Sequence, residues 1–232
     1  MVKYFFCSNA KLIANLATVF IPFKYIRKSV RKKLFKKLIN NELIKNINKI
    51  IQNNKNPIII YLGLLSYFDP MTQRPHHIFR KLADKGFIIF WPDYKVLKLT
   101  KVADNIYIFP VVCIDTMLNI EKDKIIYIVA HYYLESAQYF ISLLKQVRKL
   151  KIIYDYIDDL SLFGKSTQKQ CQKVLSFVKN ANALFLASAD KLYDELARIV
   201  PKDSLLSSKN AVNIEDFHRK QYTLPIKLNP IV

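Results

Sequence analysis

Short apolar runs alternate with longer amphipathic stretches from residue 58 to residue 208, and this alternation constrains the fold more than any other feature. Runs such as Ile58–Leu62 and Ile125–Ala130 are almost continuously apolar, as strands buried on both faces are. The predicted strands are 58–62, 87–90, 106–112, 125–130, 152–154, 183–187 and 204–208. The stretches between them predict helices over 73–86, 133–150, 166–180 and 188–199. This order predicts an α/β fold, a Rossmann-like doubly wound parallel sheet.

The composition limits the classes of protein that remain. With 232 residues, 51% hydrophobic and 13% aromatic, the chain has enough apolar surface for a packed core, which argues against disorder. Only three glycines are present, and no GxGxxG or Walker sequence signals a dinucleotide or P-loop site. The three cysteines are widely spaced, and neither they nor the scattered His and Asp residues have metal-ligand spacing. We therefore expect no metal site.

The first 56 residues are strongly basic. They hold 13 of the 37 Lys and Arg residues but one acidic residue, Glu42, and so carry a net charge of +12 of the chain's +19. Within residues 22–51 an apolar stripe with i, i+4 spacing is surrounded by basic residues, which is typical of a helix lying on an anionic membrane surface. A helix packed on the body with a solvated charged face is the alternative. Nucleic acid is disfavoured as a partner because aromatic residues are scarce in the basic run.

The uneven distribution of charge divides the chain into two parts. We expect residues 1–56 to form a basic amphipathic helical extension and residues 57–232 to form the α/β domain. The apolar segment Leu12–Phe23 is shorter than the ~20 residues that span a bilayer. With the basic helix as a membrane contact, the expected location is cytoplasmic and peripheral, at the inner face of the cell membrane.

Three acidic residues follow the predicted strand at 152–154. Asp155, Asp158 and Asp159 come directly after its apolar core. Open α/β sheets bind their ligands at the carboxyl ends of the strands, so these acids are candidate site residues. Aspartates are also common as helix caps and in turns, so capping and exposure to water are equally open for each of them.

Several segments that follow strand ends form an ordered series. They are QRPHH (73–77), WPD (91–93), AHYY (130–133), YDYIDDLSLF (154–163), ASADKLYDELAR (187–198) and NAVNIEDFH (210–218). The series resembles the N-terminal domain of GT-B glycosyltransferases of the group 1 type, especially bacterial enzymes of lipopolysaccharide and surface-polysaccharide assembly. The last segment departs from the family pattern, with Ala211 in place of Gly and Asn213 in place of Asp.

The resemblance implies a set of site residues. His131 would be an acid/base or a positioner of a hydroxyl, and Asp158 would be the second catalytic residue. The implied substrate-binding residues are Gln73, Arg74, His76, Asp155, Asp159 and Ser188. Each has a structural alternative: capping and loop hydrogen bonds at 73–76, a satisfied strand-end histidine at 131, capping by Asp159, and an N-cap role for Ser188.

The implied activity is sugar transfer from a nucleotide-sugar to a lipid-linked or surface-polysaccharide acceptor, without a metal. The sequence stops about where the family's donor-binding domain would begin. We therefore expect the acceptor-binding half alone, with a separate donor-domain chain as a possible partner. The alternative is a non-catalytic remnant or recruiting subunit. The sequence names neither the sugar nor the acceptor, nor whether the anomeric centre is retained or inverted.

Overall fold

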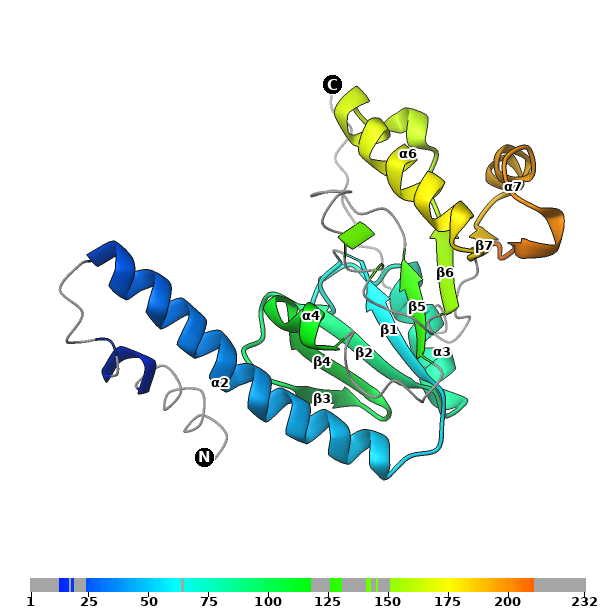
Figure 1. Cartoon of the computed structure of the whole chain (residues 1–232). Helices are drawn as coiled ribbons and strands as arrows, with labels where there is room; N and C mark the ends of the chain where they lie inside the picture. The colour runs from blue at the N-terminus through cyan, green and yellow to red at the C-terminus, as the bar shows by residue number, and fades with distance from the viewer. Residues whose placement is uncertain are drawn as a thin grey trace, which may run out of the picture.

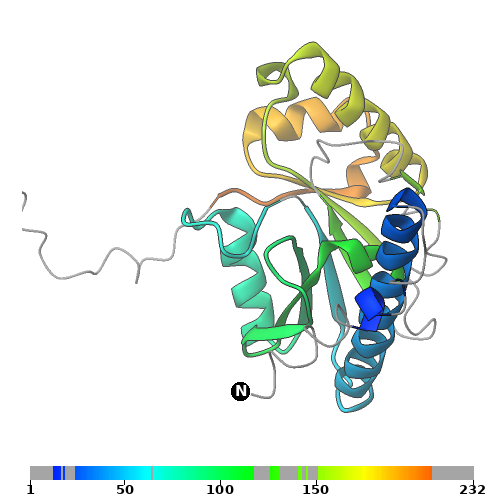
Figure 2. The same ribbon diagram turned by 90° about the vertical axis from the view of Figure 1, so that its left-hand side faces the viewer.

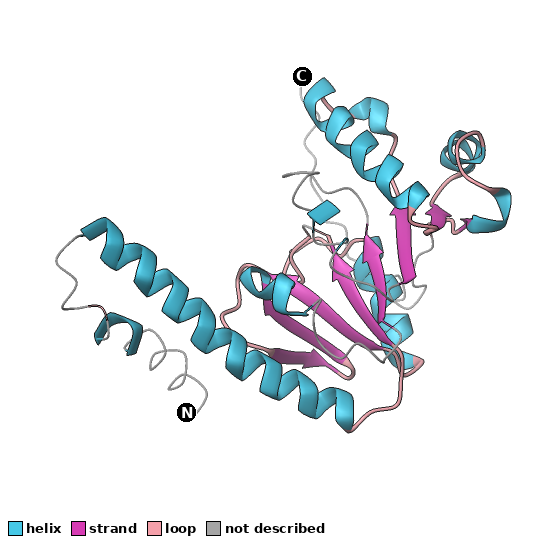
Figure 3. Ribbon diagram, viewed as in Figure 1, coloured by secondary structure: helices cyan, strands magenta, loops and turns pink. Residues whose placement is uncertain are grey.

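The computed structural model describes residues 13–16, 18, 24–63, 65–117, 126–130, 141, 142, 145 and 151–210. An eight-stranded sheet runs through them in the order β3-β4-β2-β1-β5-β6-β7-β8 (Figures 1 and 3). All neighbouring strands are parallel except β3, which is antiparallel to β4. The strands are β1 Ile58–Leu62, β2 Ile88–Asp93, β3 Thr100–Ala103, β4 Ile106–Pro110, β5 Ile126–Ala130, β6 Lys151–Tyr156, β7 Leu184–Ala187 and β8 Leu205–Ser207. The predicted parallel α/β sheet is confirmed.

The direction of the chain through the sheet reverses beside β1. From β1 it moves outward to β2 and β4, then returns to β5 on the opposite side of β1 and continues through β6 and β7 to β8. Ile60 accordingly pairs with Phe90 on one side and with Ile128 on the other. Ligand crevices of open α/β sheets lie at such a switch point, outside the carboxyl ends of the strands.

Helices cover both faces of the sheet. They are α2 Lys24–Gln52, α3 Arg74–Asp84, α4 Ile114–Met117, α6 Lys165–Asn180 and α7 Asp190–Ala197, with short 3-10 helices at Val111–Cys113, Leu160–Leu162 and Lys202–Ser204. Phe79 of α3 is buried with Tyr61 on one face, whereas Val174 of α6 is buried with Ile60 on the other. Figure 2 shows α2 and α3 on opposite sides of the sheet. Because β1→β2 and β6→β7 run in opposite directions across the sheet, right-handed crossovers place their helices on opposite faces.

The helix α3 positions the first candidate site residue, Arg74. Pro75 lies in its first turn, where a missing N–H costs nothing, and Gly86 follows its end with φ 91°, as the sequence pattern predicts. A Cβ at Gly86 would lie 3.1 Å from Nδ2 of Asn56, so the turn after α3 also passes close to the entry of β1. These two residues fix where α3 starts and stops.

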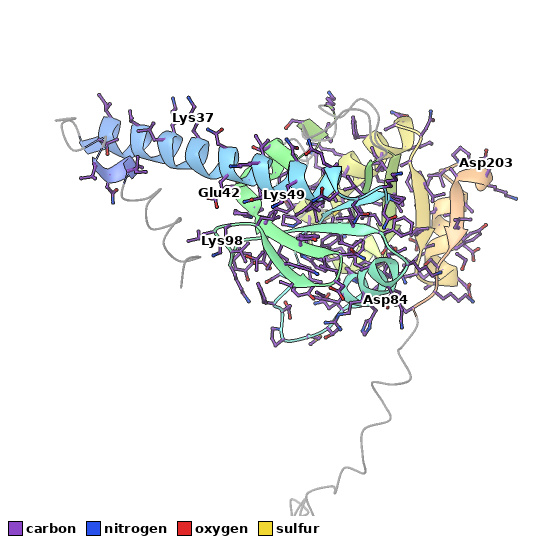
Figure 4. All side chains as sticks on the ribbon, turned by 90° about the horizontal axis from the view of Figure 1, so that it is seen from below. Lys37, Glu42, Lys49, Asp84, Lys98 and Asp203 are labelled. Atoms are coloured by element: carbon purple, nitrogen blue, oxygen red, sulfur yellow. The ribbon has the colours of Figure 1, made fainter. Side chains whose placement is uncertain are left out.

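The basic helix α2 has two different halves. Leu43, Ile47 and Ile51 of its second half are buried in the core with Ile58 and Ile60. Its first half extends beyond the sheet, with Lys37 pointing away from the body (Figures 1 and 4). Ile26 of this half is 53% exposed. The apolar stripe from Leu43 to Ile51 therefore packs on the body, which was the alternative to membrane contact.

Several predicted boundaries differ from the structure. Strand β3 was not predicted, because it is a four-residue edge strand whose period-2 pattern is too short to stand out. The predicted strand 106–112 ends at Pro110 and turns into a 3-10 helix, and β6 runs two residues further than predicted, to Tyr156. The predicted helix 133–150 lies almost entirely outside the described residues. Within the described part of the chain, no helix has the length and apolar content needed to cross a bilayer.

Replacing an isoleucine by alanine should reduce stability by different amounts in the two halves of α2. Ile47 is fully buried, so Ile47→Ala should lower the free energy of unfolding by about 2–5 kcal/mol, through lost burial and a new cavity. Ile26→Ala, on the exposed half, should change it by less than about 0.5 kcal/mol. Urea unfolding of both variants measures the difference. Equal costs would show that the second half of α2 does not belong to the core.

Candidate functional site

A largely buried ion pair lies at the carboxyl edge of the sheet. Arg74, the first residue of α3, donates from Nε to Oδ2 of Asp155 (3.0 Å) and from Nη2 to Oδ1 (3.1 Å). The two side chains are 11% and 6% exposed. Bidentate pairing of this kind gives fixed geometry as well as attraction. Arg74 and Asp155, two of the implied substrate-binding residues, are therefore in direct contact.

Asp155 does not follow β6, as expected, but belongs to it. Side chains alternate between the faces of a strand, so Asp155 points to the α3 face while Tyr154 and Tyr156 are buried in the core on the other face. The apolar run was expected to end at residue 154 because an aspartate interrupted it. The guanidinium of Arg74 is what allows a carboxylate inside the strand.

Arg74 also binds the segment after β8. Its Nη2 donates to Oγ of Ser208 (2.9 Å) and its Nη1 to Oδ1 of Asn210 (3.1 Å). Four of the five N–H groups of the guanidinium are therefore used, and the fifth, on Nη1, has no acceptor in the described part of the chain. One side chain thus joins α3, β6 and the chain beyond β8.

The ion pair lies in a poorly solvated environment. Burial raises the pKa of Asp155, and the hydrogen bonds and charge of Arg74 oppose that rise. The neighbouring Tyr61 is fully buried on β1, and burial followed by the charge of Asp155 raises its pKa. Buried titratable groups at the ligand-binding edge of a sheet are candidates for a functional site.

Hydrogen bonds of His76 and Gln73 hold the start of α3. His76 is 2% exposed, and its Nδ1 accepts the backbone N–H of Gln73 (3.1 Å). Its Nε2 lies 3.2 Å from the carbonyl oxygen of Tyr67, so the neutral ring carries its proton there and donates it. The ring also packs on Trp91 with centroids 4.9 Å apart. Both nitrogens are used by the backbone, so the capping alternative describes His76 in this structure.

The other predicted residues lie on the loops beside β6 and β7. Asp159 accepts the N–H of Ser161 (2.8 Å) and pairs with Lys191, and these partners, Lys191 first, lower its pKa to about 2. It is the cap of the 3-10 helix Leu160–Leu162, which confirms the capping alternative. Asp158 is exposed, and His131 lies outside the described residues. No metal-binding group of three or more His, Cys, Asp or Glu side chains exists among the residues that are described.

The expected N-cap role of Ser188 is wrong. The N-cap of α7 is Ala189, and the hydroxyl of Ser188 donates instead to the carbonyl oxygen of Ile157 (3.0 Å). This bond ties the loop after β6 to the end of β7. Ser188 thus supports the loop that carries Asp158.

A second anchor, for which the sequence predicted no role, holds the loop before α3. Asp93, at the end of β2, accepts the hydroxyl of Ser66 (2.7 Å) and the N–H of Tyr67 (2.8 Å) through Oδ2. Trp91 donates from Nε1 to the carbonyl oxygen of Leu65 (2.8 Å). The WPD segment was one of the resembling segments, but its local pattern gave no role, because its partners lie 26 and 27 residues away.

Removing the negative charge at Asp155 should destabilise the fold. Asp155→Asn leaves the largely buried guanidinium of Arg74 without a counter-charge, so we expect the free energy of unfolding to fall by about 3–5 kcal/mol. The matched control is Asp104→Asn, which breaks the exposed pair with Lys101 and should leave stability unchanged. Chemical unfolding at neutral pH compares the two. An Asp155→Asn variant as stable as the control would contradict a structural role for the ion pair.

Protonation of His76 should destabilise the fold below about pH 6.5. Burial, and then the charge of Arg80, lowers the pKa of His76 below 6.5, and protonation would also remove the acceptor for the N–H of Gln73. In that pH range the unfolded state binds more protons, so stability falls as the pH drops from about 6.5 towards the lowered pKa. Unfolding curves measured from pH 7.5 to pH 5 test this. His76→Gln should flatten the slope and the neighbouring His77→Gln should retain it; a slope that survives His76→Gln would rule out this histidine as its source.

Comparison with protein-family models and with curated proteins found no match to this chain. The assignment of the site therefore depends on its geometry and on the resemblance of the sequence segments to GT-B glycosyltransferases. That resemblance stays a prediction.

Proposed function

We propose that this chain is the acceptor-binding half of a GT-B-type glycosyltransferase, which transfers sugar from a nucleotide-sugar to a lipid-linked or surface-polysaccharide acceptor. The observation that carries the proposal is the meeting of Arg74 with Asp155 at the carboxyl edge of the sheet, next to the switch point between β1 and β5. Of the resembling segments, WPD forms the end of β2, and YDYIDDLSLF runs from the end of β6 into the loop that follows it. The assignment of an activity rests on them and not on the fold, since folds of this type serve many functions.

The proposed roles follow from what each side chain can do. Asp158 is an exposed carboxylate and would accept a hydrogen bond from an acceptor hydroxyl. The remaining N–H of Arg74 would bind a phosphate or carboxylate oxygen of the acceptor. His131 is proposed as the acid/base. A second domain or a partner chain would bind the nucleotide-sugar.

A non-catalytic recruiting subunit is the second candidate. It is favoured by the degree to which Arg74 is already used, since four of its N–H groups bind Asp155, Ser208 and Asn210. A guanidinium held in this way stabilises the edge of the sheet whether or not a substrate binds. The two candidates differ in whether the edge binds an acceptor.

Acceptor binding tests the proposal directly. Calorimetric titration of the chain with isoprenyl-pyrophosphate sugars should detect binding, and Asp158→Asn should weaken it roughly tenfold by removing a hydrogen bond to a charged group. Asp203→Asn changes another exposed carboxylate, before β8 and away from the carboxyl edge, and should have no effect (Figure 4). The chain alone should transfer no sugar from nucleotide-sugars. If the chain binds none of the isoprenyl-pyrophosphate sugars, the recruiting subunit is favoured. Equal affinities of the Asp158→Asn and Asp203→Asn variants would exclude Asp158 from the site.

The projecting half of α2 is the proposed membrane contact. Residues 24–40 contain eight Lys and Arg residues and no acidic residue, and they extend beyond the sheet (Figure 1). Lys33 and Lys37, one turn apart, are exposed, and so is the apolar Ile26. Basic residues near an anionic bilayer surface contribute about 1 kcal/mol each. The apolar stripe from Leu43 to Ile51 takes no part, because the core buries it.

Charge removal on α2 should release the chain from anionic vesicles. Lys33→Gln/Lys37→Gln should lower the partition coefficient about thirtyfold in vesicle flotation, from about 1 kcal/mol for each lysine. Lys169→Gln/Lys173→Gln removes two exposed lysines with the same spacing on α6 and should leave binding unchanged. Binding of the wild-type chain should need anionic lipid and weaken with salt. Equal loss in both double variants would point to net charge and not to α2.

A further inference from the structure

A cavity of about 320 Å³ lies on the face of the sheet that α3 covers. It follows α3 from Pro75 near its start to Leu82 near its end, and Ile153 of β6 and Leu186 of β7 lie on its other side. The cavity ends at the carboxyl edge of the sheet, where Asp155 is one of its lining residues. It therefore leads directly to the Arg74–Asp155 ion pair.

The cavity exists because one face of the sheet is only partly covered. On β7, Phe185 and Ala187 are buried against the α6 and α7 side, whereas Leu184 and Leu186 on the α3 face are partly exposed. Leu206, which pairs with Leu186, is 50% exposed. Strands of parallel sheets are normally covered on both faces. Among the residues that the structure describes, α3 is the one helix on this face, and it lies over β1 and β2.

The walls determine what can occupy the cavity. Apart from Asp155 and the hydroxyl of Tyr61, the lining side chains are hydrocarbon or aromatic, and both carboxylate oxygens of Asp155 are held by Arg74. A buried water needs two to four polar partners, and apolar cavities of about 150 Å³ stay dry and bind small hydrocarbons. A pocket of at least about 300 Å³ with a few polar groups at one end has the size and character of a ligand site.

From these features we propose that the cavity beside α3 binds the apolar chain of an amphiphile whose oxygen-bearing head lies at Arg74. The chain lies along α3, between Ile78 and Leu82 on one side and Ile153 and Leu186 on the other. The head accepts the Nη1 N–H that the described residues leave without an acceptor. A hydrocarbon chain matches the walls, and an anionic head matches the guanidinium at the end of the cavity.

This inference concerns the same edge as the proposed function, since both use the remaining N–H of Arg74, but it requires no sugar donor and no transfer step. A chain that binds alkyl ligands but no lipid-linked sugar would keep the cavity site and lose the glycosyltransferase assignment. A chain that binds soluble oligosaccharides but no alkyl ligand would do the opposite. The two proposals therefore fail separately.

The test is titration calorimetry of the full chain with decyl phosphate below its critical micelle concentration. Decyl phosphate should bind saturably, decanol about tenfold more weakly, and inorganic phosphate not measurably. The fluorescence of Trp91, the single tryptophan, should respond as well, because its ring packs 4.5 Å from that of Tyr61, which lines the cavity. Equal affinities for decanol and decyl phosphate would show that Arg74 does not bind the head of the ligand.

Variants that fill the cavity distinguish it from the rest of the apolar face. Leu186→Phe should weaken decyl phosphate binding at least tenfold, and Leu206→Phe, on the same face but outside the cavity, should bind like the wild type. Ile78→Phe fills the cavity from α3 and replaces Leu186→Phe if that variant does not fold. Equal affinities in filled and control variants, or no saturable binding of decyl phosphate to the wild type, would overturn the proposal. The proposal would also be overturned if Leu186→Phe changed the molar mass of the protein in solution, because this would identify a second copy of the chain as the occupant.

Discussion

The guanidinium of Arg74 connects parts of the chain that lie far apart in sequence. It pairs with Asp155, 81 residues away, and binds Ser208 and Asn210, 134 and 136 residues away. A carboxylate inside a buried strand needs a partner of opposite charge, because desolvation otherwise drives it to protonate. The position of α3 against β6, and the path of the chain as it leaves β8, both depend on this one side chain. The interaction therefore has a structural role before any ligand is considered.

Two anchors of similar design fix the carboxyl edge of the sheet. Asp93 at the end of β2 holds the loop that precedes α3, and Asp155 on β6 holds the first residue of α3. Ser188 adds a third tie, between the end of β7 and the loop after β6. Side chains on rigid strands thus position loops, which is how α/β proteins keep binding residues in place on their surfaces. Any ligand at this edge meets loops whose positions are already set.

The sequence predicted those features that depend on local pattern. Buried strands appear as apolar runs, and the ends of α3 are marked by Pro75 and Gly86. Asp155 was singled out because it directly follows an apolar run, but its place inside β6 depends on Arg74, which no local window contains. Ser208 carried no signal at all, since its partner is 134 residues away. In α2, an i, i+4 stripe is compatible with a core or with a membrane, so periodicity alone left the two uses of Leu43–Ile51 open.

The continuity of α2 has a geometrical consequence. A helix of 29 residues is about 43 Å long, and here a single helix of this length is clamped into the core at one end and free of the sheet at the other. The angle between α2 and the sheet is therefore fixed. Whatever holds the distal turns also sets the tilt of the whole sheet, and with it the direction in which the rim bearing Arg74 faces.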